Sequence, residues 1–99
     1  MTRPDRLTIA TAARLVADIA ADPERVIYSA HAQQRMRERR ITPAEVIGCL
    51  TKGIITEGPF VNIRNAWQVR ISRQTTRKLH VVVAIERQQR LIVITTIVE

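Results

Sequence analysis

The spacing of apolar residues along the chain changes once, close to residue 53. Before that point apolar residues recur three or four positions apart, as they do on one face of an amphipathic helix. This spacing predicts helices over residues 8–21, 29–40 and 42–52. Beyond residue 53 apolar and polar residues alternate with the period of two that is typical of strands.

Residues with known capping preferences stand at the expected helix ends. Ser29 is placed to accept from the first free amides of the second helix. Thr42, Pro43 and Glu45 have the spacing of a capping box with proline at the first helical position. Gly53 is expected to end the third helix in the left-handed conformation.

Four segments alternate or are apolar enough to form strands, namely 54–60, 67–73, 78–86 and 91–98. The last segment is apolar on both faces, as an interior strand is. Gly58-Pro59 predicts a bulge in the first strand or its end. Because the turns "QTTR" and "RQQR" are short and polar, the strands should pair as antiparallel hairpins. The predicted fold class is therefore α+β, with three N-terminal helices followed by a four-stranded antiparallel sheet.

The alternation also constrains how the two middle strands pair. Directly opposed residues share a face, so the apolar positions meet only if paired residue numbers have an even sum. Arg70 opposite Val82, with Ser72 opposite His80, is one such pairing. Every even pairing puts Arg70, Lys78 and His80 on the same face of the sheet. One face should therefore pack against the helices, and the other should carry a basic patch with a histidine.

Length and charge narrow the class of protein. A chain of 99 residues is expected to form a single domain. Its formal net charge of +7 suggests a polyanionic partner, most commonly nucleic acid. The single cysteine, Cys49, excludes an internal disulfide and fits a reducing, cytoplasmic compartment. No run approaches eighteen consecutive apolar residues, so no membrane span is expected.

His31, Arg35, Glu38 and Arg39 fall on one stripe of the second predicted helix. One interpretation is an anion-binding stripe in which His31, close to the helix N-terminus, stays neutral and acts as a base. The other is structural: Arg35 and Glu38 form an ordinary i,i+3 pair, and His31 hydrogen-bonds a neighbouring loop. His80 has the same two interpretations, as a catalyst or as a hydrogen-bonded histidine.

The remaining candidates for nucleic-acid contacts are basic residues in the middle and second half of the chain: Arg39, Arg64, Arg70, Arg73 and Lys78. Trp67 lies in the apolar register, which favours the core, although at a sheet edge it could stack on a base. The two histidines have no cluster of carboxylates around them, so no metal site is predicted. No glycine-rich loop for a nucleotide cofactor is present either.

The stretch "YSAHAQQRMRERRITPAEVIGCLTKGIITEG", with the three strands after it, resembles the bacterial domain-of-unknown-function 4258 family. The resemblance covers about residues 27–97 and leaves 1–26 as an N-terminal helical extension. The matching positions are His31, Arg35, Met36, Glu38, Arg39, Ile41, Thr42 and Gly53. That family is in turn similar to the RelE/ParE toxin superfamily, compact sheet-and-helix proteins that include mRNA endonucleases. The resemblance implies a RelE-like fold, although RelE-like chains usually open with a strand.

The leading hypothesis is a small RelE-like toxin that binds RNA, free or on the ribosome, and cleaves it without a metal. His31, Arg35 and His80 are the candidate catalytic residues, for proton transfer and for stabilising phosphate charge. An acidic antitoxin protein would be its partner. One alternative is a non-catalytic module that binds nucleic acid. Another is a protein-interaction module whose doubly apolar last strand forms a homodimer or antitoxin surface.

Overall fold

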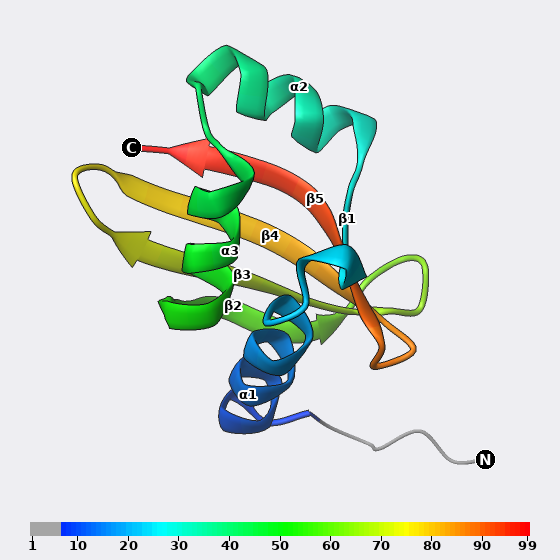
Figure 1. Ribbon diagram of the computed structural model, residues 1–99. Coiled ribbons are helices and arrows are strands. Elements are labelled where there is room, and N and C mark those ends of the chain that lie inside the picture. The colour runs from blue at the N-terminus through cyan, green and yellow to red at the C-terminus, as the bar shows by residue number, and fades with distance from the viewer. Residues whose placement is uncertain (1–6) are drawn as a thin grey trace.

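Within residues 7–99, which the computed structural model describes, three α-helices form where the periodicity predicted them (Figure 1). They are α1 (Ile9–Ala20), α2 (Ala30–Arg39) and α3 (Pro43–Lys52), with a short 3-10 turn, η1 (Pro23–Arg25), after α1. The first six residues of the expected N-terminal extension lie outside the described part. None of the described helices has the length and hydrophobicity needed to cross a membrane.

The predicted helix starts are confirmed in atomic detail. The Ser29 hydroxyl accepts from Ala32 N at 3.0 Å at the start of α2. At the start of α3, Thr42 Oγ1 accepts from Glu45 N, and Glu45 Oε1 accepts in return from Thr42 N at 3.0 Å. Each cap satisfies amide groups that the first turn of a helix leaves unpaired.

The third helix ends before Gly53, as predicted, but the predicted left-handed conformation of Gly53 is wrong. Its backbone is extended, with φ −81° and ψ −178°, and not left-handed. A side chain is excluded there by packing, because a Cβ would lie 2.5 Å from Cys49 O and 2.7 Å from Ser72 O. The left-handed cap occurs instead at Arg40, which follows α2 with φ 55°. Gly53 is therefore needed where the chain leaves α3 close against the sheet.

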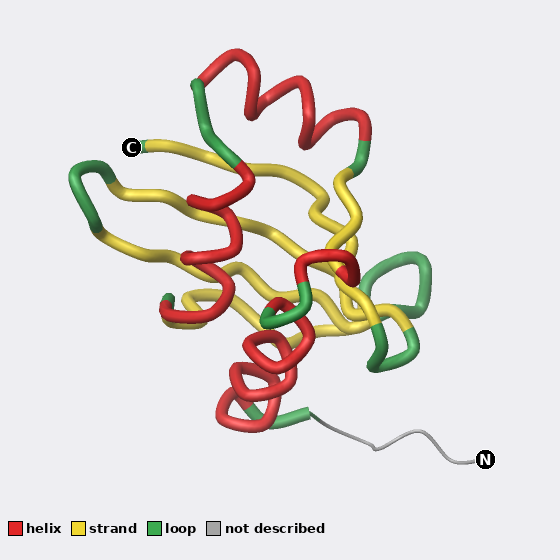
Figure 2. The backbone as a smooth tube through the Cα atoms, in the orientation of Figure 1, coloured by secondary structure: helices red, strands yellow, loops and turns green. Residues whose placement is uncertain are grey.

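The sheet has five strands in the order β1-β5-β4-β3-β2 (Figure 2). They are β1 (Val26–Tyr28), β2 (Ile54–Val61), β3 (Trp67–Gln74), β4 (Lys78–Glu86) and β5 (Arg90–Val98). The four predicted strands pair antiparallel, as expected from their short turns. The class α+β is confirmed.

The prediction of a four-stranded, all-antiparallel sheet is wrong, because β1 adds a fifth strand parallel to β5. Its three residues, Val26 to Tyr28, pair with Leu91 to Val93. A segment of this length has no readable periodicity of its own, and its partner lies more than sixty residues later in the chain. β1 makes β5 an interior strand over residues 91–93, and α2 lies beside the rest of β5.

The pairing expected for the middle strands is the one observed. Arg70 lies opposite Val82, and Ser72 lies opposite His80. The β2–β3 pairing shifts register around Gly58-Pro59, as predicted for a bulge. The sequence therefore located the polar face of the sheet correctly.

Helices cover one face of the sheet. α1 and α3 lie across it, whereas α2 lies beside β5 at the edge (Figures 1 and 2). α1 contributes Ala12, Val16 and Ile19 to the same core as the sheet residues Val69, Val81 and Leu91, all at most 1 % exposed. The other face, which we call the open face, carries Gln68, Arg70 and Ser72 of β3, His80, Val82 and Ala84 of β4, and Ile92, Thr95 and Ile97 of β5.

Candidate functional site

His80 lies on the open face among polar side chains of β3 and the side chain of Glu99, which follows β5. The hydroxyl of Ser72, its partner across the strands, hydrogen-bonds to His80 Nδ1. Arg70 Nε donates to the same nitrogen at 3.4 Å. Glu99 Oε2 lies 3.2 Å from His80 Nε2. Because Nδ1 accepts from Arg70, the proton of the neutral ring is on Nε2.

His80 is 5 % exposed, although no helix covers this face. Side chains bury it: Arg70 and Glu99 lie against the ring, and Thr56 Oγ1 lies 3.3 Å from Ser72 Oγ beneath it. Glu99 is within ion-pair distance of Nε2 without hydrogen-bond alignment, so this buried nitrogen has no hydrogen-bond partner among the described residues. Buried polar atoms of this kind are rare in native proteins, and each has a specific cause, such as a catalytic role or a bound water or ion.

Charged groups of both signs surround the histidine. Arg70 lies 3.8 Å from Glu57, and Lys78 lies 3.9 Å from Glu99. The two carboxylates are 64 % and 57 % exposed, so each ion pair contributes about 0–1 kcal/mol at most. An anionic ligand can replace these carboxylates at Arg70 and Lys78 at little cost in free energy.

His31 reaches the same face from the start of α2. Its Nε2 lies 3.1 Å from the hydroxyl of Thr95, and Thr95 lies opposite Val82 in the sheet. Thr95 and His80 are thus diagonal neighbours, with Cα atoms about 7–8 Å apart. The two histidines do not touch, but both border the position above Val82.

We call that position the Val82 site. Across the strands it is bordered by Arg70 on β3 and by Thr95 on β5, whose Cα atoms are two strand spacings, about 10 Å, apart. His80 borders it along β4, and His31 borders it above Thr95. Val82 itself is half-buried and forms an apolar floor. The Val82 site can accept an anion, because one positive group, Arg70, and two imidazoles, His31 and His80, lie at its margin.

The structure does not bring the arginines of α2 to His80. Arg35 pairs with Glu38 at 3.4 Å, and both side chains are 45 % exposed. Arg39 is exposed one turn later. Because α2 lies beside β5, these residues follow His31 along the edge of the sheet, whereas Arg70 lies two strands away. Both the i,i+3 pair and the exposed basic stripe are therefore present.

The other basic candidates are distributed over both faces. Lys78 lies on the open face beside His80, and Arg64 is exposed in the β2–β3 loop. Arg73 lies on the opposite, helix-covered side, where its Nη1 would be 2.5 Å from a Cβ built on Gly48 of α3. Arg73 therefore cannot act together with Arg70, although both are on β3.

Ser72 and Glu99, which contact His80, were not named as site residues from the sequence. The alternation that placed Arg70 and His80 on one face places Ser72 there too, so its contact with His80 could have been inferred. Glu99 gave no such signal, because the last strand could not be registered against its neighbour. A bulge between Val82 and Val83 shifts that pairing by one residue, which alternation alone does not reveal.

A groove continues the open face beyond the Val82 site. It has a volume of about 1120 Å³ and lies between the β2–β3 loop, residues 62–66, and the β4–β5 turn. Ala84, Ile92 and Ile94 line it in the sheet, and His31 lies at its margin. Figure 1 shows this loop and this turn at the same end of the sheet, opposite the end where Glu99 lies. We call this feature the loop groove.

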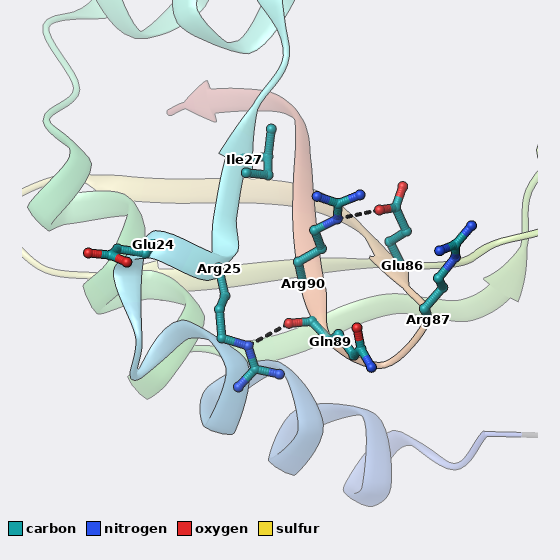
Figure 3. Close-up of a pocket in the computed structure, with 7 residues that line it drawn as sticks. All are labelled: Glu24, Arg25, Ile27, Glu86, Arg87, Gln89 and Arg90. Carbon is teal, nitrogen blue, oxygen red and sulfur yellow. Dashed lines mark hydrogen bonds and ion pairs between the residues drawn. The ribbon is translucent and has the colours of Figure 1, made fainter.

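A second, smaller pocket lies outside β1 and contains three arginines (Figure 3). Arg25 Nε donates to Gln89 O, which ties the segment before β1 to the β4–β5 turn. Arg90 is paired with Glu86 on the same hairpin. Figure 3 shows Arg87 projecting away from both contacts. Two of the three arginines are thus engaged in holding the turn.

Cys49 is fully buried, and burial raises the pKa of its thiol to about 12. It therefore stays protonated at neutral pH and is not a nucleophile. Burial also raises the pKa of Tyr28, which remains a neutral phenol. No group of three or more histidine, cysteine or carboxylate side chains is placed to hold a metal ion within residues 7–99.

Comparison with known proteins gives one match. The family described as Domain of unknown function (DUF4258) matches residues 28–98, which comprise α2, α3 and β2 to β5 together with the last residue of β1. No curated protein and no solved structure matches the chain. α1 lies outside the matched residues, although it contributes to the core. Because the match covers well over half of the chain, this protein belongs to the DUF4258 family.

Proposed function

We propose that this protein binds single-stranded RNA on the open face of its sheet and cleaves it without a metal ion, as a RelE-like toxin. The observation that carries the proposal is the environment of His80. Its Nε2 is buried without a hydrogen-bond partner among the described residues, next to Arg70 and Lys78. A phosphate oxygen at the Val82 site would supply that partner. Glu99, whose Oε2 lies 3.2 Å from Nε2, would move away from the ring.

The two histidines can supply both proton transfers. In the proposed step the 2′-oxygen attacks the neighbouring phosphorus, and the bond from phosphorus to the 5′-oxygen breaks. His31 takes the 2′-proton, and His80, protonated at Nδ1 once Arg70 has turned from that nitrogen to the phosphate, gives its Nε2 proton to the departing 5′-oxygen. Arg70 stabilises the additional negative charge on the phosphate oxygens. The products are a 2′,3′-cyclic phosphate and a 5′-hydroxyl, and His31 and His80 exchange their protonation states.

The remaining basic residues extend the binding surface. Arg35 and Arg39 follow His31 along α2 by one and two turns, so they contact flanking phosphates and do not take part in the chemistry. The strand can be free or bound to the ribosome. In a toxin of this kind an acidic antitoxin protein would cover the same basic face, through charge complementarity.

The test uses a 5′-labelled single-stranded RNA in buffer with EDTA, followed by analysis of the product ends. We expect a 2′,3′-cyclic phosphate and a 5′-hydroxyl from the wild-type protein. Removing a proton-transfer group by His31→Ala should slow cleavage by about 10²–10⁴-fold. Arg70→Ala should slow it by about 10²–10³-fold, because a donor to the phosphate is lost.

Arg73→Ala is the matched control, since it removes the same charge from the same strand on the opposite face. It should leave cleavage unchanged. Equal losses in Arg70→Ala and Arg73→Ala would mean that net charge matters and the Val82 site does not. If the RNA stays intact with the wild-type protein, and if its induced expression leaves bacterial growth unimpaired, cleavage is excluded.

A second candidate function is RNA binding without cleavage. The burial of His80 favours it, because the ring is reached only after Glu99 has moved. This candidate predicts that affinity falls steeply with salt, with a slope near −0.7 for each phosphate contact on a single strand. Arg70→Ala would then reduce the slope by about 0.7 with no product formed, while Arg73→Ala leaves it unchanged.

A further inference from the structure

The loop groove has a different chemical character from the Val82 site. Ala84 and Ile92 of the open face, together with Ile94 at the bulge of β5, give its floor an apolar surface. The groove begins where the charged cluster ends, since Ala84 is four residues beyond His80 on β4, a distance of about 13 Å. A ligand that extends along the open face therefore passes from a basic site onto an apolar one.

Neutral amide side chains border this floor. Asn62 Nδ2 donates to Gln68 Oε1 at 3.0 Å. Asn62 Oδ1 in turn accepts from Arg64 N at 2.9 Å and from Ala66 N at 3.1 Å, which holds the β2–β3 loop in shape. The Gln68 nitrogen makes no hydrogen bond within the described residues, so it remains a donor at the groove. Gln88 adds a further amide from the β4–β5 turn.

The loop above the groove carries an unusual pair of exposed residues. Ile63 is completely exposed at 102 %, and Arg64 beside it is exposed as well. Arg87 lies at the opposite margin of the groove, on the turn. Ile63 and Arg64 both line the groove, so its loop side offers an apolar side chain and a cation.

We propose that the loop groove binds one unstacked nucleobase of the RNA strand whose phosphate lies at the Val82 site, an inference that rests on the proposed function. A nucleobase has apolar faces and a polar edge. The faces fit the Ala84 and Ile92 floor, with Ile63 closing from the loop. The edge fits the donors and acceptors of amide side chains. Arg64 and Arg87 at the margins fit the phosphates on either side. Because amide side chains and arginines surround the apolar floor, a nucleobase with its phosphates fits the groove better than an apolar peptide segment does.

The test measures the binding of fluorescein-labelled, fully 2′-O-methylated RNA strands, which cannot be cleaved, by anisotropy. One strand is intact, and in a series of otherwise identical strands each internal nucleotide in turn is abasic. We expect one position at which loss of the base weakens binding about 5- to 100-fold, as for loss of one stacked base. Ile92→Ser, and independently the fully exposed Ile63→Ser, should reduce that difference. Arg70→Ala should weaken all strands equally.

Equal affinity for the intact and all abasic strands, with strong salt dependence, would overturn the nucleobase site and leave RNA binding intact. No binding of any strand by a folded protein would overturn the proposed function and this inference together. A peptide rich in leucine and glutamate that binds more tightly than RNA, and depends on Ile92, would overturn the inference in favour of a protein ligand. Thermal unfolding of each variant shows that it is folded.

Discussion

Arg77, in the turn between β3 and β4, connects three parts of the fold through one guanidinium group. Its Nη1 donates to Arg39 O at 2.9 Å and its Nη2 to Arg40 O at 2.7 Å, at the end of α2. Nη2 also donates to Glu45 Oε1 at 3.0 Å, in the first turn of α3. The turn between the two helices is thereby held against the sheet. Arg77→Ala should therefore destabilise the protein without touching its core.

The size of the effect can be worked out from these contacts. The Arg77 side chain is 29 % exposed, so its two hydrogen bonds to carbonyls are partly screened, at about 1 kcal/mol each. The ion pair with Glu45, which is 35 % exposed, adds about 0.2–1 kcal/mol. The free energy of unfolding should fall by about 2–3 kcal/mol. For a domain of this size that lowers Tm by about 10–20 °C.

The assay is urea and thermal unfolding followed by circular dichroism. Arg77→Lys should lose most of the same free energy, because an ammonium group cannot reach both carbonyls and the carboxylate in a fork. Arg37→Ala is the matched control: it also removes one arginine, from an exposed position on α2, and should change stability by less than about 0.5 kcal/mol. If Arg77→Ala and Arg37→Ala have the same stability, the role assigned to Arg77 is refuted.

Two further predictions concern α3. Gly53→Ala should strongly destabilise the protein, because its Cβ would lie 2.5 and 2.7 Å from backbone oxygens. Gly48→Ala is the control: its Cβ would meet only the movable end of an arginine side chain, so it should be neutral or stabilising by up to about 1 kcal/mol. Unfolding in urea compares the two variants, and equal effects on stability would contradict the packing argument. The hydrogen bond from the Thr42 backbone, and after it Arg77, lowers the pKa of Glu45 below its ordinary value of 4.5. The ionised Glu45 carboxylate therefore stabilises the fold above pH 4.5, and this contribution is lost as the pH falls through the lowered pKa of the folded protein. Glu45→Gln should therefore be less stable than wild type at pH 7, with a difference that shrinks below pH 4.5; a constant difference would refute this.

Local patterns predicted much of the fold because their causes are local. Capping residues such as Ser29 and Thr42 act within one helical turn, so their spacing alone locates a helix start. Alternation placed Arg70 and His80 on one face because a strand turns its side chains over at every residue. The paired strands had to bring their apolar residues together, so the register between them followed as well.

The rest depended on contacts between distant segments. β1 exists because residues 91–93 offer it a parallel edge, and nothing in its own three residues requires a strand. Arg73 and Arg77 counted toward a basic surface in the sequence, yet one lies on the helix-covered side and the other binds backbone carbonyls. Charge can be counted from a sequence, but whether a charge faces a ligand is set by its neighbours.

The sequence by itself determined the helices, four of the strands, the pairing of the two middle strands and the side of the sheet on which His80 lies. These follow from periodicity and capping, which act over a few residues. Only the tertiary structure decided that His31 and His80 border one site while Arg35 does not, and that Glu99 lies against His80. The reason is that α2 lies beside β5 and that a bulge shifts the last hairpin, and both depend on packing between segments far apart in the chain.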